Sequence, residues 1–417
     1  TFNGGVTLNA GAILVNNNNA QALGALPTSG SLTISSQGTS ASLASAGSWT
    51  SGMWLYTSGT QIGTQITSIS GLNITTAGSL AASGGSLVYS AGAALTFNAG
   101  TLMASGAATV GQPVVIGSSA TLVSLGGPVA TNNITLSGPV YLGGGGLNYV
   151  GTQTISVFSP LATGTISGPL IGGTYAALAK AGAGTLNLSS AYNWLPGGVT
   201  VSGGILLLSS GSALAGGGPL IMAGGALDSG TATILTNNPQ VWNGTFGFIG
   251  SNALNTGTGT VSLGTSTTVS VLNNMLTVGG AIGDGGAGFG LFKTGIGTLA
   301  LSGTSTYFGL TTINSGSLRL VGGTNGTGTV GGTNTLAIGG SLLMLGGTLD
   351  LVGGSQTLSA ASLTAGLIQS GTFVTTSSIT VNSVLPVVIS STLSGAQGLV
   401  KLGSSTLTLS GANTLGG

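Results

Sequence analysis

The chain has 417 residues and a formal net charge of +1, with four basic residues, three acidic ones, and neither His nor Cys. Without Cys there is no disulfide framework or thiol nucleophile, and without His there is no Ser-His-Asp triad or imidazole metal site. The near-zero charge excludes an electrostatic footprint for nucleic acid, and no apolar run reaches the roughly 18 residues that a membrane-spanning helix needs.

The N-terminal residues, about 1–35, contain the apolar pattern VTLNAGAILV, which begins at Val6. Thr1 is preceded by no Met and followed by no basic-then-apolar leader, so we expect a mature or excised segment. Over about 40–175 the sequence is less regular, but short alternating apolar runs continue. Gly85 to Gly106, for example, contains three such runs separated by glycine. This spacing leaves no room for crossover helices, and it is typical of a β-sandwich or of a coil of short strands.

From Lys180 onward the chain contains clear internal repeats. A block of ten begins at Lys180 (KAGAGTLNLS), Lys293 (KTGIGTLALS) and Lys401 (KLGSSTLTLS). A second block follows the first two copies and begins at Val199 (VTVSGGILLL) and at Thr311 (TTINSGSLRL), and the pattern at Val6 matches it. A third element, Gly-Gly-x-Leu-Asp, ends at Asp228 and at Asp350, and residues 144–148 are a weaker copy with Asn for Asp.

The repeats predict which side chains face inward. In each strand the apolar residues fall on one face and a small or polar residue falls on the other, so Arg319 and Asp350 should point outward. No stretch has a helical period, so no helix longer than about two turns is expected. We expect seven residues of the repeat blocks to point inward: Val201, Leu206, Leu208, Leu299, Leu301, Leu318 and Leu320.

The order of these blocks resembles the autotransporter-associated β-strand repeat family, which occurs in very long secreted bacterial passenger and surface proteins. The resemblance is strong over 180–210, 293–322 and 401–417, moderate over 1–35 and weak over 40–175. It implies a right-handed parallel β-helix (β-solenoid) at a bacterial cell surface or outside the cell, and it implies no catalytic residues. We therefore expect an all-β chain in which each coil uses roughly 20 residues.

The expected domain organisation is one continuous β-helix over 1–417. Its repeat-like segments are about 1–35, 180–230, 293–351 and 401–417, the last of them incomplete, and 40–175 forms degenerate coils. Alignment with the internal copy matches Thr414 to Thr306 and Thr306 to Thr1, so the last repeat runs into the motif with which the chain begins. We expect both terminal coils to be open faces that continue into further polypeptide or into a stacked subunit.

Few residues qualify as chemical sites, and each has a structural interpretation. Asp284 lies in a G-x-G-x-x-G pattern, but no helix pattern follows and a cation needs more oxygens, so it is interpreted as a turn residue. Asp228 and Asp350 occupy equivalent slots many coils apart, too far for a glycosidase pair. We expect no catalytic, cofactor-binding or metal-binding residues, no cofactor and no enzymatic activity.

Other candidates concern binding surfaces. Scattered aromatics could line a carbohydrate groove, although such residues more often fill corners and contacts: Trp49, Trp54, Tyr56, Trp194 and Trp242. Lys180, Lys293 and Lys401 are interpreted as long stems over the apolar rim with heads in water. Thr256, Thr258 and Thr260 would share one face of a strand, which is the best candidate for a flat Thr array.

The near absence of charge favours a protein that assembles, because neutral rods with small side chains have little to oppose close association. The leading functional interpretation is a structural segment of an extracellular fibre, sheath or matrix whose partner is itself, through end-to-end and lateral contacts. The alternative is the stalk of an adhesin or autotransporter passenger with its binding tip elsewhere. A third is an ice- or polysaccharide-surface binder. Surface or matrix polysaccharide is a further possible partner; nucleic acid and membrane insertion are not expected.

Overall fold

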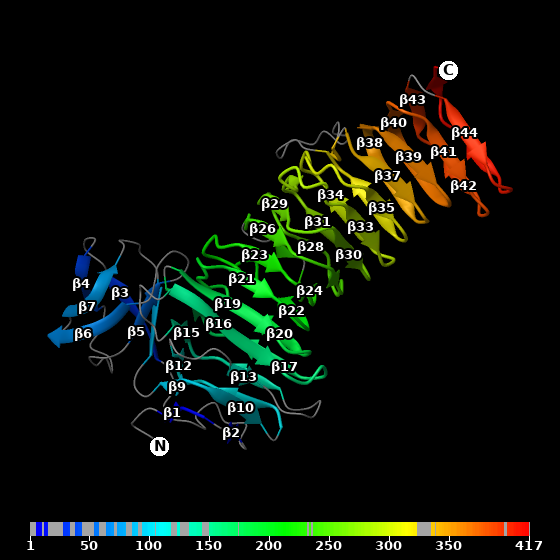
Figure 1. The fold of residues 1–417 in the computed structure, drawn as a ribbon. Helices are drawn as coiled ribbons and strands as arrows, with labels where there is room; N and C mark the ends of the chain where they lie inside the picture. The colour runs from blue at the N-terminus through cyan, green and yellow to red at the C-terminus, as the bar shows by residue number, and fades with distance from the viewer. Residues whose placement is uncertain are drawn as a thin grey trace. The chain divides into compact units, whose positions relative to one another are not determined.

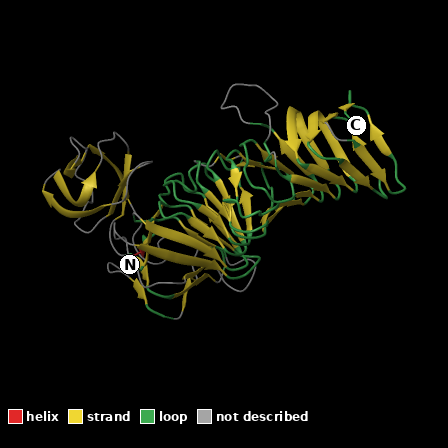
Figure 2. Cartoon of the chain, turned by 45° about the horizontal axis from the view of Figure 1, so that its top comes forward, coloured by secondary structure: helices red, strands yellow, loops and turns green. Residues whose placement is uncertain are grey.

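The structure is a computed structural model that is described in separate stretches along the chain. The described residues are 6–10, 12–15, 28–33, 38–43, 54–57, 64–70, 73–80, 86–90, 94–104, 106–117, 123–125, 133–143, 150–173, 175–231, 233–234, 237–322, 335–337, 339–395 and 398–416. These stretches consist almost entirely of strands and connecting loops, and they contain no α-helix (Figure 2). The chain divides into two compact units, Thr1–Pro219 and Leu220–Gly417.

The first unit contains three parallel sheets whose strands follow one another in repeating order around each coil. The first sheet has β1 (Val6–Leu8), β9 (Leu95–Phe97), β12 (Val114–Ile116), β15 (Val140–Leu142) and β18 (Leu170–Ile171). The second has β2 (Ala12–Val15), β10 (Gly100–Ala104), β13 (Val123–Leu125), β16 (Val150–Val157), β19 (Tyr175–Ala181) and β21 (Val199–Val201). The third has β11 (Ala108–Val110), β14 (Ile134–Leu136), β17 (Thr163–Ile166), β20 (Thr185–Leu188) and β22 (Ile205–Leu208).

Between the first coil and the second, the chain departs from the expected degenerate coils. Six strands form a closed barrel with antiparallel pairing instead of parallel coils. They are β3 (Thr28–Thr33), β4 (Gly38–Leu43), β5 (Trp54–Thr57), β6 (Thr64–Ser70), β7 (Asn73–Leu80) and β8 (Ser86–Ser90). Alternating apolar patterns are compatible with either pairing direction, because both present side chains to opposite faces with period two.

The second unit also contains three parallel sheets (Figure 1). The first has β23 (Leu220–Met222), β26 (Gln240–Trp242), β29 (Val261–Leu263) and β32 (Ile282–Gly283). The second has β24 (Ala226–Ser229), β27 (Phe246–Phe248), β30 (Thr267–Val271), β33 (Leu291–Thr294), β35 (Thr311–Ile313), β37 (Ser341–Met344), β39 (Ala360–Leu363), β41 (Ile379–Asn382) and β44 (Leu399–Leu402). The third has β25 (Thr233–Ile234), β28 (Leu254–Asn255), β31 (Met275–Val278), β34 (Thr298–Leu301), β36 (Ser317–Leu320), β38 (Thr348–Leu358), β40 (Gly366–Thr375), β42 (Val387–Ile389) and β45 (Leu407–Leu409). Outside this order, β40 also pairs with β43 (Thr392–Gly395), and β43 pairs with β46 (Thr414–Leu415).

The register of these strands gives the length of a coil. Leu276 pairs with Leu299 and Leu299 pairs with Leu318, so each of these coils takes about 20 residues, as a solenoid repeat does. The next step, from Leu318 to its partner Leu349, is longer than the two before it. The coil length agrees with the expected value, and the predicted all-β parallel β-helix is confirmed. The expected single continuous β-helix over 1–417 is corrected, because the antiparallel strands from β3 to β8 interrupt the parallel coils.

The core consists of inward side chains stacked from coil to coil. Leu276, Leu299, Leu318 and Leu349 form one such stack, and each is almost completely buried. All seven side chains that the repeats place inward are buried, which confirms the predicted register. Each leucine in the stack removes apolar surface from water, and full burial of such a side chain stabilises the fold by about 1.5–3 kcal/mol.

Candidate functional site

Lys180 and Lys293 lie inside the coil, and this corrects the expectation that their heads are in water. Lys180 is 0% exposed and Lys293 is 1% exposed. Both occupy inward positions, because Lys180 pairs with the buried Val201 and Lys293 pairs with the buried Ile313. A lysine ammonium is buried in this way only where its three N–H donors find acceptors.

Backbone carbonyls supply those acceptors at equivalent positions of the two repeats. The Nζ of Lys180 donates to the carbonyls of Ala181, Gly182 and Gly203 at 2.8, 3.0 and 3.0 Å. The first two belong to the turn that follows the lysine, and the third belongs to the same turn one coil later. Each ammonium therefore ties two neighbouring coils together.

Lys293 makes the same set of contacts. Its Nζ donates to the carbonyls of Thr294, Gly295 and Ser315 at 2.8, 2.8 and 3.2 Å. In both repeats the second acceptor is a glycine with positive φ, 75° at Gly182 and 76° at Gly295. This backbone conformation strains any residue with a Cβ, which explains why glycine follows the lysine by two positions.

Burial changes the pKa of both lysines. Removal from water lowers the pKa of Lys180 and the pKa of Lys293 to about 8. The three carbonyl contacts favour the protonated form, and the ammonium has no donor left for another ligand. All three N–H donors of each ammonium are therefore used within the fold, and these two lysines hold neighbouring coils together.

Lys401, the third copy, is less enclosed. Its Nζ donates to the carbonyls of Leu402 and Gly403 at 2.6 and 3.0 Å, and Gly403 has a φ of 73°. These are the two acceptors from its own turn. The equivalents of Gly203 and Ser315 would lie 22 or 23 positions after the lysine, beyond the last residue of this sequence.

A second repeated contact follows the lysine by 12 or 13 positions, and sequence reasoning missed it. The Oδ1 of Asn193 accepts the backbone N–H of Leu170, and the Oδ1 of Asn413 accepts that of Leu393, both at 2.9 Å. At the corresponding position the Oγ of Ser305 accepts the N–H of Ile282 at 3.4 Å. In each case a polar side chain satisfies a backbone donor of the preceding coil.

Asp284 is a turn residue, as its isolated position predicts. Its carboxylate accepts the backbone N–H groups of Gly286, Gly288 and Phe289 at 2.7–3.0 Å, and that of Phe308 at 3.4 Å. Burial alone would raise the pKa of Asp284, but these hydrogen bonds together hold it below its ordinary value. Because N–H donors converge on the carboxylate, the loop is unsuited to a cation.

Asp228 and Asp350 are not brought together. Asp228 lies on β24 and Asp350 on β38, which follows β37 on the same coil. Five strand pairings of about 4.8 Å separate β24 from β37, or about 24 Å along the stack. A glycosidase pair requires roughly 5–10 Å, so this separation agrees with the expectation that they do not act together.

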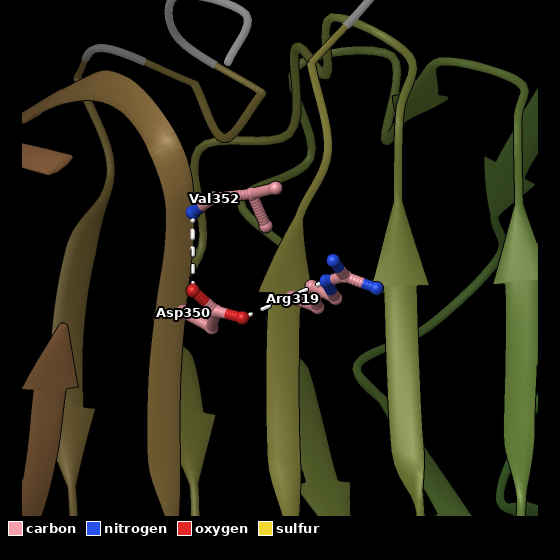
Figure 3. A network of polar contacts seen from close by, with 3 residues as sticks. All are labelled: Arg319, Asp350 and Val352. Carbon is pink, nitrogen blue, oxygen red and sulfur yellow. Dashed lines mark hydrogen bonds and ion pairs between the residues drawn. The ribbon is translucent and has the colours of Figure 1, made fainter. Parts of the chain in front are cut away.

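The two aspartates have different local partners. The Oδ2 of Asp228 accepts the hydroxyl of Ser251 at 2.7 Å. Asp350 lies beside Arg319 on the neighbouring coil, with 3.6 Å between Oδ2 and Nε, and its Oδ1 accepts the N–H of Val352 (Figure 3). Arg319 and Asp350 are partly exposed at the outward positions that the sequence predicts, and an ion pair in water contributes little to stability.

The candidate Thr array is not formed, because Thr256 to Thr260 is a turn between β28 and β29 and not a strand. Gly257 has a φ of 76°, which breaks the alternation. Thr256 is buried and accepts a hydrogen bond from Gln240, while Thr258 and Thr260 are exposed. No single face therefore carries the three threonines.

Among the aromatic candidates, Trp242 belongs to the core. It is buried against Phe246 with ring centroids 5.1 Å apart, and its Nε1–H donates to Gln240. Trp194 is partly buried. Trp49 and the side chains of Trp54 and Tyr56 lie outside the described residues. The described part of the chain contains no cluster of three His, Cys, Asp or Glu side chains placed to hold a metal ion. It also contains no helix with the length and hydropathy required to cross a membrane.

The fold and the lysine-centred turns define a repeat-built parallel β-helix. The passenger-associated-transport-repeat family matches this chain over 178–208, 291–320 and 399–417, the segments that contain Lys180, Lys293 and Lys401. These segments are similar to repeats of that family, which confirms the predicted resemblance to autotransporter passenger repeats.

One curated relative extends the comparison beyond the repeats. The chain is 29% identical over 330 residues to "Adhesin BmaC autotransporter" of Brucella suis biovar 1 (strain 1330). The alignment covers 76% of this chain and 9% of the relative, so the chain spans a small part of the length of that protein. No solved structure matches. The matches agree with a bacterial protein that is secreted to the cell surface.

Proposed function

We propose that this chain is a non-catalytic stalk within a secreted bacterial passenger. The observation that carries the proposal is the use of Lys180 and Lys293, whose ammonium groups donate two hydrogen bonds to their own turn and the third to the neighbouring coil. The passenger-type repeats and the similarity to an autotransporter adhesin support it. These comparisons favour the stalk interpretation over the fibre interpretation, which the sequence alone had placed first.

The stalk interpretation makes a testable prediction about deletion of one repeat interval. Lys293 and Lys401 occupy equivalent positions on β33 and β44, which lie in one sheet and are separated by five pairings. Deletion of residues 293–400 joins equivalent positions and shortens the stack by about 24 Å. In the native bacterium, an antibody against the first unit should still label intact cells, and any adhesion should be retained.

A deletion that joins unlike blocks is the control. Removal of residues 293–389 places Ser390 where Lys293 stood, and this deletion should abolish surface labelling. Removal of residues 303–410 joins equivalent positions again, and this deletion should be tolerated. The stalk interpretation is wrong if purified 417-residue chain binds host cells as strongly as the full-length protein does, or if it turns over a polysaccharide.

We further propose that copies of this chain associate with each other in a fibre or matrix. The chain has a net charge of +1, so charge repulsion opposes contact only weakly. Surface or matrix polysaccharide is the alternative partner, and binding of the isolated chain to polysaccharide rather than to itself would favour it.

A further inference from the structure

The antiparallel barrel is an insertion between two coils of the first unit. The strands before it pair directly with those after it, β1 with β9 and β2 with β10. The step along the chain from Val6 to its partner Leu95 is nevertheless far longer than the next step, from Leu95 to Val114. Among the described residues, strands β3 to β8 pair only with one another. The coils stack without the barrel, so the barrel is available for another task.

The registers of these six strands divide their residues between two faces. Antiparallel partners lie on the same face of a sheet, and successive residues of a strand lie on opposite faces. One face carries apolar residues from every strand: Leu32, Leu43, Leu55, Ile69, Ile74 and Leu87. The other face carries hydroxyl and amide residues from the strands other than β5: Ser29, Ser42, Gln65, Ser70, Asn73 and Ser90.

Strand β5 places two aromatic residues on the hydroxyl-rich face. Trp54 pairs with Gln65 on one side and with Ser90 on the other. Tyr56, two positions later, pairs with Val88. A closed barrel encloses one face of each strand, and the apolar face is the one that gains from enclosure. Trp54 and Tyr56 therefore belong to the outer face, together with the hydroxyl and amide residues.

We propose that the outer face of the barrel around β5 binds a neutral polysaccharide. Trp and Tyr present flat apolar surfaces with a polar end, and the C–H faces of sugar rings stack on such surfaces. Ser, Asn and Gln both donate and accept hydrogen bonds, as sugar hydroxyls require. Residues 1–179 contain no charged residue, so nothing on the barrel attracts a charged polymer. The proposal goes beyond the stalk function, because it assigns binding to the inserted barrel and support to the coils.

Retention on immobilised polysaccharide tests this site. The 417-residue chain is passed over glucan, mannan and galactan as neutral probes and over polygalacturonate as the acidic probe. Retention is expected on a neutral probe and not on the acidic one. W54A/Y56A should lower that retention by about tenfold or more, because the stacking surface is lost. W54F keeps an aromatic ring at the same position and should lower retention less than W54A does.

Two matched variants place the binding on the barrel. Tyr175 is 64% exposed on β19 of the coils, so Y175A removes an exposed aromatic residue elsewhere and should not change retention. Removal of residues 28–90 takes out the barrel strands but keeps β1, β2, β9 and β10, which pair across it. The shortened chain should lose retention while the coils still unfold cooperatively in urea.

Thermolysin cleavage reports whether the barrel stays folded in each variant. Thermolysin cuts beside apolar residues, and it is used because residues 1–179 contain no Lys or Arg for trypsin. L55A removes a residue of the apolar face and should expose the barrel to cleavage. W54A/Y56A should leave the barrel resistant, so that its loss of binding is not a loss of the fold.

Several results would overturn the barrel proposal. They are no retention on any neutral probe, equal retention on polygalacturonate, and equal retention of W54A/Y56A and the parent chain. Cleavage of W54A/Y56A as fast as of L55A would show that the assignment of the two faces is wrong. Retention of the chain without residues 28–90, or a loss for Y175A as large as for W54A/Y56A, would place the binding on the coils. The stalk interpretation is judged separately by surface labelling of its deletion variants and by binding to host cells, and it survives each of these results.

Discussion

Replacement of Lys293 by methionine is expected to lower the free energy of unfolding by about 3 kcal/mol. Methionine keeps much of the apolar stem but leaves the carbonyls of Thr294, Gly295 and Ser315 without their donor. Each buried acceptor left unpaired costs about 1–3 kcal/mol, and relief of the buried charge offsets part of the sum. Urea unfolding followed by circular dichroism should show a lower midpoint at an unchanged slope.

The matched control is the same substitution in the third repeat. Lys401 is partly exposed and its carbonyl partners, Leu402 and Gly403, are accessible to water, so K401M should cost about 1 kcal/mol or less. Water can replace the lost donor there, whereas it cannot at Lys293. Equal losses for K293M and K401M would contradict the assignment of the buried lysine as an inter-coil contact.

Replacement of Gly295 by alanine should be at least as damaging, with a loss of about 3 kcal/mol or more, because two costs add. Its φ of 76° is unfavourable for any residue with a side chain. A Cβ at this position would also collide with the backbone carbonyl of Val271 on the preceding coil. Relief of the collision requires the turn to move, and the acceptors of Lys293 move with it.

Gly285 separates these two costs. It has a φ of 63°, but a Cβ there would have no neighbour within 4 Å. G285A should therefore cost only the backbone strain, about 1–2 kcal/mol. Thermal or urea unfolding of both variants measures the difference between their losses of stability. If G295A destabilises the chain no more than G285A does, the coils are not packed as closely as in the structure.

The parts of the fold that could be predicted are those in which a short pattern has one physical solution. Leu299 and Leu301 alternate along one strand, and Arg319 separates Leu318 from Leu320 on another. These patterns assign the buried face correctly because a strand has a period of two. The recurrence of whole blocks indicated stacked coils, since neighbouring strands in the stack carry the same pattern. The resemblance to a repeat family then supplied the direction of pairing.

The predictions that were wrong concern contacts between residues that are distant in sequence. The barrel between β3 and β8 could not be predicted because alternation does not distinguish antiparallel from parallel pairing. Burial of Lys180 and Lys293 was missed because the charge favoured water, and the compensating carbonyl of the next coil lies 22 or 23 positions away. One signal was available: the lysine takes an inward position of the register and is followed by glycine at the second position in all three copies.

The Thr256–Thr260 array failed for a local reason. Alternation of Thr with Gly matches a strand by pattern, but glycine also permits positive φ, and Gly257 adopts it. The preference of glycine for turns outweighed the strand preference of threonine in this segment. Alternation that depends on glycine is therefore weaker evidence for a strand than alternation of two residues with side chains.

Amine labelling of the folded chain tests the central claim, that Lys180 and Lys293 are enclosed between coils. A water-soluble acylating reagent is applied to native protein, and the extent of reaction at each lysine is read from peptide masses. Lys401 should react readily, whereas Lys180 and Lys293 should react only after denaturation, since they are 0% and 1% exposed. Native-state labelling of Lys293 at the rate of Lys401 would contradict the account.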